Sequence, residues 1–274
     1  MIKSLMKHGV ELSDPDSVIR FLNVCSWESG TKDIAIDSYR DYLNMLGLKD
    51  VQLPHIRRDE KDPFIPLEEE LDALISNART KMSSLLRVLK ESAVRPIEAW
   101  RLKWLDIDVA NRCVTITPAK YSKPRRPKIS EQTLNILCSL PRTGECVFSP
   151  SGNKEQFSDE LEHFAINFCK MKRRVAGKLA NPRISLISLR TFRYWKATTL
   201  YHQTKDILYV KEFLGHKNIA NTLRYVHLAN ALAGNEDGYT CKLAKTVHEA
   251  SDIIENGFEY VTEMDSVKLF RKRK

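Results

Sequence analysis

The sequence predicts a mainly α-helical protein with a small antiparallel β-sheet, an α+β fold in which a small helical N-terminal domain precedes a larger one. Three observations predict this. Apolar residues recur at helical spacing along most of the 274 residues. Short segments rich in β-branched residues flank a polar turn at residues 119–124. A segment of mixed charges with two prolines interrupts the helical pattern at residues 52–63.

The first fifty residues predict two helices. The first covers residues 14–27, with Ser13 or Asp14 as its N-cap and Pro15 in its first turn. The second covers residues 32–47, because its apolar side chains share one helical face: Ile36, Tyr39, Leu43 and Leu46.

The proline-containing segment divides the chain. We expect a small helical domain at residues 1–50, a linker at 51–63 and a larger domain at 64–274. A piece of about 50 residues is too small for a strong independent core.

The larger domain should be helical with two β-hairpins. The strands of the first are expected at 113–117 and 126–130, with Pro127 indicating an edge position, and residues 257–271 alternate on both sides of Met264 and predict the second. Helices are expected at residues 67–77, 81–90, 96–103, 131–139, 156–176, 188–203, 206–213, 218–227 and 240–256.

The charge is distributed unevenly. The chain carries a net charge of +9, whereas residues 1–50 hold six Lys and Arg against eight Asp and Glu, so the rest of the chain carries +11. A basic domain suits a polyanionic partner, because Lys and Arg near phosphates release condensed counterions. Charge alone fits an ordinary basic surface equally well.

The six cysteines do not predict a metal site or a disulfide framework. They contain no C-x-x-C pair, and no His pair has zinc-finger spacing. We therefore expect a reducing compartment and a cytoplasmic localisation. The sequence contains no stretch of 18 or more apolar residues, so it predicts no membrane span. The N-terminal residues lack the apolar core of a secretion signal.

One set of residues, between Arg190 and Tyr225, has side chains suited to catalysis. Cleaving a DNA strand without a metal needs a nucleophile, fixed cations around the phosphate oxygens, and a proton donor for the leaving oxygen. Arginine provides a permanently charged fork for phosphate, tyrosine can form a covalent ester, and lysine or histidine can donate the proton. The sequence holds these residue types in one segment: Arg190 and Arg193 are three residues apart, His216 follows Leu-Gly, and Tyr225 lies nine residues after His216.

This pattern resembles the tyrosine recombinase signature, in which a basic residue, an arginine, Leu-Gly-His and the nucleophilic tyrosine follow in this order. The segment from Ala93 to Asp106, with Arg95 and Glu98, resembles the first box of the family. With Arg190 in place of the usual histidine, the sequence is most similar to archaeal virus or plasmid integrases. The resemblance covers roughly residues 65–274 and implies the tyrosine-recombinase catalytic fold.

The resemblance also implies roles. Arg95 and Arg193 would clamp the scissile phosphate, and Arg190 and His216 would contact its other oxygens, with His216 helping to manage the tyrosine proton. Tyr225 would attack the phosphorus and form a 3′-phosphotyrosine.

The resemblance implies roles for residues before this set as well. Lys120 in the turn would protonate the leaving 5′ oxygen, with Lys123 as the alternative, and Glu98 would orient Arg95. The resemblance implies no metal, ATP or other cofactor.

The expected partners follow from the same resemblance. They are double-stranded DNA at attachment sites and a homotetramer on paired sites. The helix at 240–256 is where partners would dock, although its apolar residues fit packing on its own domain equally well: Leu243, Val247, Ile253 and Ile254.

Two other functions stay open at this point. A type IB topoisomerase uses the same tyrosine chemistry, and a DNA-binding protein that has lost catalysis would keep the fold. A lone tyrosine on a helix is usually a packing residue, so Tyr225 carries weight only through its series.

The chain departs from the family pattern in two places. Ala93-Val94 replaces Gly-Leu before Arg95, and Pro96 follows it, where proline suits the first turn of a helix. The N-terminal part is shorter than is usual for the family and mildly acidic, which puts a complete DNA clamp in doubt.

Overall fold

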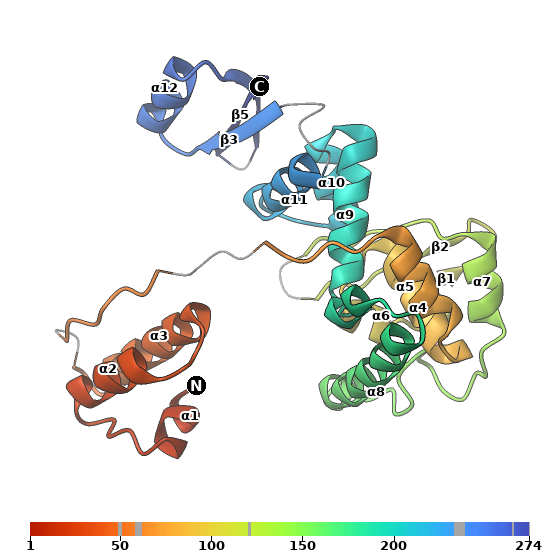
Figure 1. Ribbon diagram of the computed structural model, residues 1–274, viewed down its shortest axis with the longest axis horizontal. Helices are drawn as coiled ribbons and strands as arrows, with labels where there is room; N and C mark the ends of the chain where they lie inside the picture. Colours follow the sequence, from red (N-terminus) through yellow and green to blue (C-terminus); the bar gives the residue numbers. More distant parts are fainter. Residues whose placement is uncertain (49–50, 58–61, 120–121, 233–238, 265, 274) are drawn as a thin grey trace. The chain divides into compact units, whose positions relative to one another are not determined.

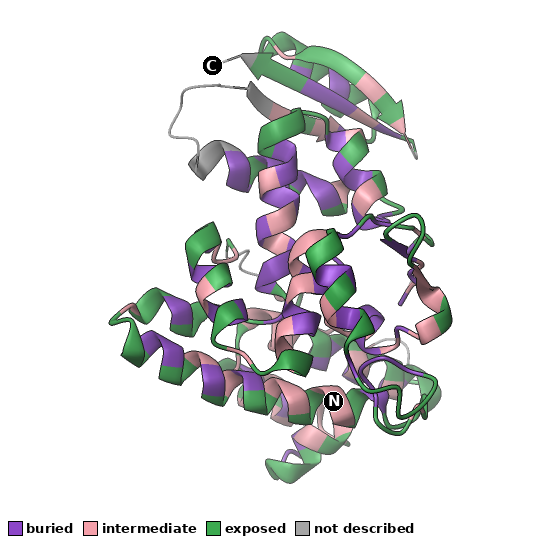
Figure 2. Cartoon of the chain, turned by 90° about the vertical axis from the view of Figure 1, so that its right-hand side faces the viewer, coloured by how far each residue is buried: buried purple, intermediate pink, exposed green. Residues whose placement is uncertain are grey.

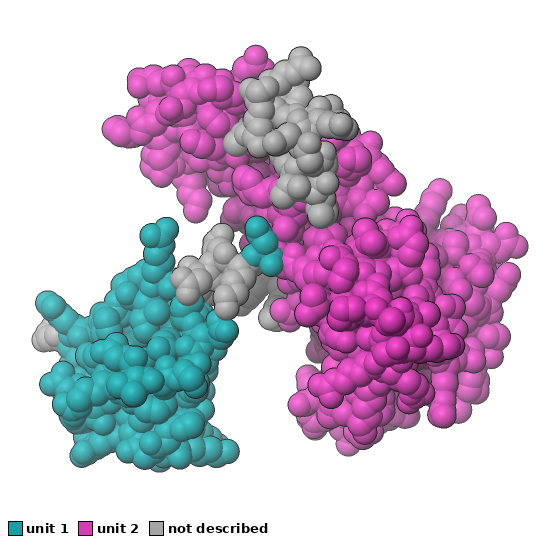
Figure 3. All heavy atoms as spheres, in the orientation of Figure 1, with its two compact units in different colours: residues 1–62 teal, residues 63–274 magenta. Residues whose placement is uncertain are grey.

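The chain forms two compact units. The computed structural model describes residues 1–48, 51–57, 62–119, 122–232, 239–264 and 266–273. Met1–Asp62 forms the first unit and Pro63–Lys274 the second, drawn in teal and magenta in Figure 3. Each unit has its own buried apolar cluster.

The first unit is a small helical bundle of α1 (Ile2–Lys7), α2 (Pro15–Val24) and α3 (Ser29–Met45). Asp14 is the N-cap of α2, and its carboxylate accepts the backbone N–H groups of the first turn. The sequence did not predict α1, which is too short to show a helical period. The core residues of this unit are Leu5, Val18, Leu22, Ile36, Tyr39 and Leu43.

The second unit confirms the predicted fold class, because it is mostly helical with small antiparallel sheets (Figure 1). Its helices before the C-terminal sheet are α4 (Glu68–Ser76), α5 (Thr80–Ser92), α6 (Pro96–Trp100), α7 (Glu131–Cys138), α8 (Phe157–Lys178), α9 (Thr191–Thr204), α10 (Ile207–Leu214) and α11 (Ala220–Leu232). Two 3₁₀ segments, η1 (Trp104–Asp106) and η2 (Pro182–Leu186), join them.

Helix α9 organises this unit. It packs against α5 on one side and against α10 and α11 on the other, and Figure 1 shows it running between these groups. Most of its residues are buried, which explains why purple predominates along the central helix in Figure 2. One apolar cluster lies on the α4–α8 side and a second on the α10–α11 side.

The first hairpin is less regular than predicted. Strand β1 (Ile107–Asp108) pairs with β2 (Cys113–Val114), but the returning segment makes only isolated bridges, Arg125 with Ile116 and Lys128 with Cys113. The predicted strand at 126–130 is therefore wrong as a continuous element. Proline lacks the N–H that a ladder needs, and Pro124 and Pro127 interrupt this segment.

The predicted helix at 240–256 is wrong in its first half. Tyr239–Ala244 is strand β3, which pairs with β5 (Val267–Arg273) along its whole length, and α12 covers only Val247–Glu255. A capping box of Thr246 and Glu249 starts the helix. The sequence Tyr-Thr-Cys-Lys-Leu-Ala alternates, and a partner strand far along the chain decides its conformation.

The predicted C-terminal hairpin is confirmed. Strand β4 (Glu259–Met264) pairs antiparallel with β5, and the sheet order is β3-β5-β4. Ser266 in the turn has a φ of +60°. The four apolar residues predicted to dock partners differ in their positions. Leu243 lies in a strand, Ile253 is buried, and Val247 and Ile254 on α12 are exposed.

No helix among the described residues is both long and apolar enough to cross a bilayer.

Candidate active site

Arg95 and Glu98 open helix α6. Arg95 is the N-cap residue, and the Glu98 carboxylate accepts both the Arg95 backbone N–H and the Arg95 Nη1 at 2.9 Å. Glu98 also accepts the backbone N–H of Ala119 at 3.1 Å. Burial by itself raises the pKa of Glu98, but hydrogen bonds from Arg125 and from backbone N–H groups outweigh it, so the pKa is lowered. Glu98 therefore holds Arg95 as a carboxylate.

Arg193 lies in the first turn of α9 and is buried. Its Nη1 donates to the Ala93 carbonyl at 2.5 Å, and its Nη2 donates to the Leu214 carbonyl at 2.9 Å and to the His216 ring at 2.9 Å. Burial lowers its pKa to about 10, so it remains charged at neutral pH. These bonds use three of the five N–H groups of the guanidinium, and Arg193 also forms a hydrogen bond with Tyr225.

His216 follows Gly215, the residue with a φ of +70° that ends α10. Because arginine can only donate, Nε2 of His216 must accept from Arg193, and Nδ1 then carries the proton and donates to Thr222 Oγ1 at 2.9 Å. Burial, with the charges of Arg193 and Arg95, lowers the pKa of His216 to about 3. The imidazole is neutral. Its Nε2 lone pair accepts from Arg193 and is therefore not available to accept the Tyr225 proton.

Tyr225 lies on α11 beside this imidazole. Its ring is nearly parallel to that of His216, with centroids 6.2 Å apart, and 6.1 Å from the ring of Tyr194. Burial raises the pKa of Tyr225, and the charge of Arg193 with its hydrogen bond acts in the opposite direction. The phenol is neutral here, and the guanidinium that adjoins it favours loss of its proton.

The structure brings together four of the six predicted residues: Arg95, Arg193, His216 and Tyr225. Arg190 is at the N-cap position of α9, and its side chain is exposed instead of buried with Arg193. Lys120 lies outside the described residues. Lys123, the alternative, is exposed, and its backbone N–H donates to the Gly215 carbonyl at 2.9 Å.

Three polar residues of the cluster were not singled out from the sequence. Thr222 fixes the His216 ring, Ser122 accepts from Arg95 Nη1, and Arg125 pairs with Glu98. The position of Thr222, three residues before Tyr225 on one helix face, was the only signal in the sequence for any of them.

The cluster is cationic. The guanidiniums of Arg95 and Arg125 pair with one carboxylate, that of Glu98, and their charges, together with that of Arg193, lower the pKa of His216. Among the described residues no group of three or more His, Cys, Asp or Glu is arranged to hold a metal ion. The arrangement can bind an anion with two or more oxygens next to a tyrosine hydroxyl.

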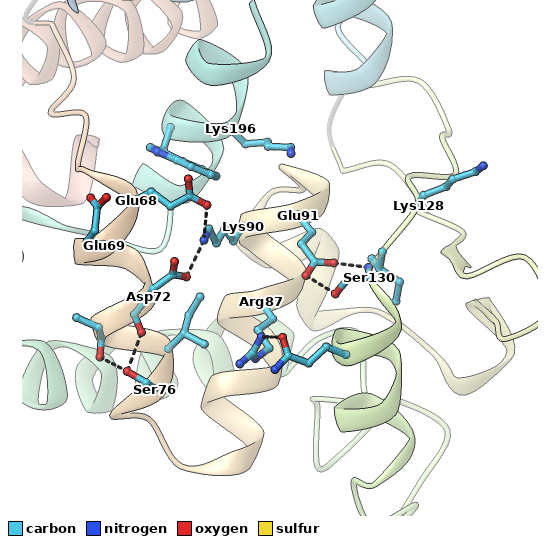
Figure 4. Close-up of a pocket in the computed structure, with 15 residues that line it drawn as sticks. Glu68, Glu69, Asp72, Ser76, Arg87, Lys90, Glu91, Lys128, Ser130 and Lys196 are labelled. Carbon is cyan, nitrogen blue, oxygen red and sulfur yellow. Dashed lines mark hydrogen bonds and ion pairs between the residues drawn. The ribbon is translucent and has the colours of Figure 1, made fainter. Parts of the chain in front are cut away.

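A separate pocket lies between α4, α5, α9 and residues 128–132 (Figure 4). Lys90 contacts Glu68 and Asp72 in it at 2.9 and 2.6 Å, and Glu91 accepts from Ser130. None of the four predicted site residues of the cluster lines it.

Comparison with known proteins agrees with this geometry. Residues 67–231 match the model of the phage integrase family, a range that includes Arg95 and Tyr225. This chain belongs to the phage integrase family. The family assignment also confirms the resemblance read from the spacing of Arg193, His216 and Tyr225.

Curated relatives share part of their length with this phage integrase family member. A probable integrase/recombinase of Methanocaldococcus jannaschii is 27% identical over 161 residues, which cover 56% of this chain and 47% of that protein. The tyrosine recombinase XerC of Staphylococcus aureus is 27% identical over 195 residues, covering 66% of this chain and 62% of that protein. The chain thus spans about half to three fifths of the length of these relatives.

Solved structures show the same fold. The Tn1549 transposon integrase in complex with transposon right end DNA aligns with a TM-score of 0.60 at 14% identity, over 82% of this chain and 84% of that one. The XerH recombinase bound to its difH substrate, post-cleavage, gives 0.55 at 18% identity, over 88% and 72%. A lambda integrase dimer bound to a core site gives 0.56 at 12% identity, over 77% and 63%.

Proposed function

We propose that this chain is a tyrosine-type site-specific DNA recombinase, an integrase that cleaves and rejoins DNA through a 3′-phosphotyrosine intermediate. The observation that supports this most strongly is the buried contact between Arg193, His216 and Tyr225, adjoining the Arg95–Glu98 pair. A phenol next to fixed guanidiniums is what an attack on a phosphodiester requires.

The reaction assigns one task to each group. Arg95 and Arg193 hold the non-bridging oxygens of the scissile phosphate and stabilise the charge that they gain. Tyr225 gives its phenol proton to water, its Oη forms a bond to phosphorus, and the bond from phosphorus to the 5′ oxygen breaks. The ammonium of Lys120, or of Lys123, gives its proton to that 5′ oxygen. A 5′ hydroxyl of a partner strand later reverses the steps.

His216 acts on Arg193 in the resting site. Its neutral ring accepts from the guanidinium and keeps it oriented, while Thr222 fixes the ring from the other side. Arg190, exposed at the start of α9, is free to turn toward DNA and contact a further phosphate oxygen.

We extend the proposal to the partners. The solved neighbours include complexes of recombinases with DNA, and residues 63–274 of this chain carry a charge of +11, which suits a DNA backbone. Double-stranded DNA at attachment sites is the substrate in this proposal, and four copies on two paired sites are the active assembly. The unit at 63–274 is the catalytic domain, and residues 1–50 are a core-binding domain.

Covalent trapping tests the proposal. Duplexes from candidate attachment sites, nicked near the cleavage position so that the cut end diffuses away, are incubated with the wild-type chain and with Tyr225→Phe. We expect a protein–DNA adduct on denaturing electrophoresis with the wild-type chain and none with Tyr225→Phe. Tyr201→Phe is the matched control, because Tyr201 is another buried tyrosine of the same unit and should leave adduct formation intact.

The same preparation separates the alternatives. Relaxation of a supercoiled plasmid that lacks any attachment site would favour topoisomerase activity. Binding of DNA with no adduct on any candidate site would favour an inactive DNA-binding protein.

A further inference from the structure

Arg125 is a buried arginine outside the residues considered so far for the reaction. Only 6% of its side-chain surface is exposed, and its Nη2 contacts Glu98 Oε2 at 2.5 Å. Its Nε and Nη1 are buried and have no hydrogen-bond partner among the described residues. Buried donors without partners cost free energy, so packing alone does not account for this side chain.

Its backbone closes the turn that follows β2. Ile116 N–H donates to the Arg125 carbonyl at 2.9 Å, and the two residues form a bridge across the turn. The segment between them carries Lys120 and Lys123 in the sequence. Arg125 therefore stands at the base of the loop that bears both candidate proton donors.

Its side chain joins this loop to two parts of the site. Through Glu98 it reaches the start of α6, where the same carboxylate holds Arg95. It also lies against Gly215, where an added Cβ would be 3.0 Å from Arg125 Nη1 and 2.9 Å from the Lys123 carbonyl oxygen. The backbone N–H of Lys123 in turn donates to the carbonyl of Gly215. The loop is therefore hydrogen-bonded to the residue that precedes His216.

We propose that Arg125 is a positioning residue for proton donation: it fixes the lysine-bearing loop against Glu98 and Gly215, so that the ammonium meets the leaving 5′ oxygen. This rests on the proposed strand-cleavage function. A misplacement of about 1 Å at a reacting group lowers the rate about a hundredfold, and we expect an effect of this size when the Arg125 side chain is lost.

The test compares two leaving groups. Wild-type, Arg125→Gln, Arg125→Lys and Arg126→Gln chains react with nicked duplexes whose scissile phosphate carries either the normal 5′ oxygen or a 5′-bridging sulfur. Sulfur leaves as a thiolate without a proton, because thiols are far stronger acids than alcohols. Arg126 is the matched control, since it is the adjacent arginine, is exposed and pairs with Asp108.

We expect Arg125→Gln to slow cleavage of the normal duplex by about a hundredfold and of the sulfur duplex by less than about threefold. Arg125→Lys should recover part of the loss, and Arg126→Gln should cleave both duplexes like the wild-type chain. Equal slowing of both duplexes by Arg125→Gln, or no slowing, would overturn the proposal.

A second measurement does not depend on activity. Amide hydrogen exchange at Lys123 should become at least about tenfold faster in Arg125→Gln, at unchanged exchange in α9. If Arg125→Gln does not fold, Arg125→Lys takes its place, with a smaller increase. Unchanged exchange at Lys123 overturns the positioning claim, whereas a wild-type chain that forms no adduct on any duplex refutes the proposed function instead.

Discussion

At the scale of single residues, the contact between Arg193 and His216 decides the protonation state of the site. The guanidinium can only donate, so the imidazole is neutral, with its proton on Nδ1 facing Thr222. Burial, together with the charge of Arg193, opposes a second proton and lowers the pKa of His216 to about 3. His216 therefore serves this site as an acceptor and not as an acid.

The depressed pKa has a consequence for stability. An unfolded chain protonates His216 below its ordinary pKa of 6.5, whereas the folded chain does not do so until about pH 3. Stability from this group is thus fully present above pH 6.5 and is lost as the pH falls toward 3.

Replacing His216 should remove this acid sensitivity. Between pH 6 and 4 the free energy of unfolding of the wild-type chain should fall more steeply than that of His216→Gln, by up to about 1.4 kcal/mol per pH unit. Denaturant unfolding at several pH values measures the difference. Parallel curves for the two chains would show that His216 is not held neutral.

Thr222 should matter through its hydroxyl. Thr222→Val leaves the buried Nδ1–H of His216 without an acceptor, which costs about 1–3 kcal/mol, and should slow adduct formation about tenfold. Thr222→Ser keeps the oxygen and should react nearly as fast as the wild-type chain. Equal rates for the valine and serine variants would contradict a role for this hydrogen bond.

At the scale of elements, the corner between α10 and α11 joins the parts of the site. Gly215 ends α10 with a φ of +70°, accepts from Lys123 and leaves room for Arg125, and His216 follows it directly. Glycine is needed here for its conformation and for the close approach of another backbone.

Gly215→Ala should therefore impair the reaction more than the fold. The left-handed conformation costs an alanine about 1–2 kcal/mol, and its Cβ would also press on the Lys123 carbonyl, so cleavage should slow at least about tenfold. Gly257→Ala is the matched control, because its φ is +78° but its Cβ would meet only the flexible Lys272 side chain. Similar cleavage rates in both variants, at similar stability, would contradict the steric argument.

The sequence predicted most helices of this molecule, because amphipathic spacing and caps such as Asp14 are local signals. It failed at β3, whose partner β5 lies more than twenty residues further along the chain. It also missed Arg125, because nothing in a polar turn indicates that one of its arginines is buried against Glu98. The cluster of Arg95, Arg193, His216 and Tyr225 was predictable because the residues and their spacings resemble the tyrosine recombinase signature, whereas the exposure of Arg190 was not.

At the scale of the whole molecule, the two units differ in charge. Residues 1–62 carry −2 and residues 63–274 carry +11, and the second unit also holds the two larger apolar clusters. Folding and electrostatic attraction to DNA should therefore both reside in the second unit.

A fragment of residues 63–274 should unfold cooperatively on its own, as followed by circular dichroism in denaturant. Its apparent affinity for a random duplex should fall by about a hundredfold or more between 50 and 200 mM salt, because displaced counterions drive the binding. A fragment that does not fold, or binding indifferent to salt, would contradict this division.

The proposed reaction depends most on Tyr225 as the nucleophile. Wild-type chain trapped on a nicked duplex, digested with protease and nuclease, should yield one modified peptide, with a nucleotide joined through its 3′ phosphate to Tyr225. A nucleotide on Tyr194, or on any residue other than Tyr225, or a linkage through a 5′ phosphate, would contradict the proposed function.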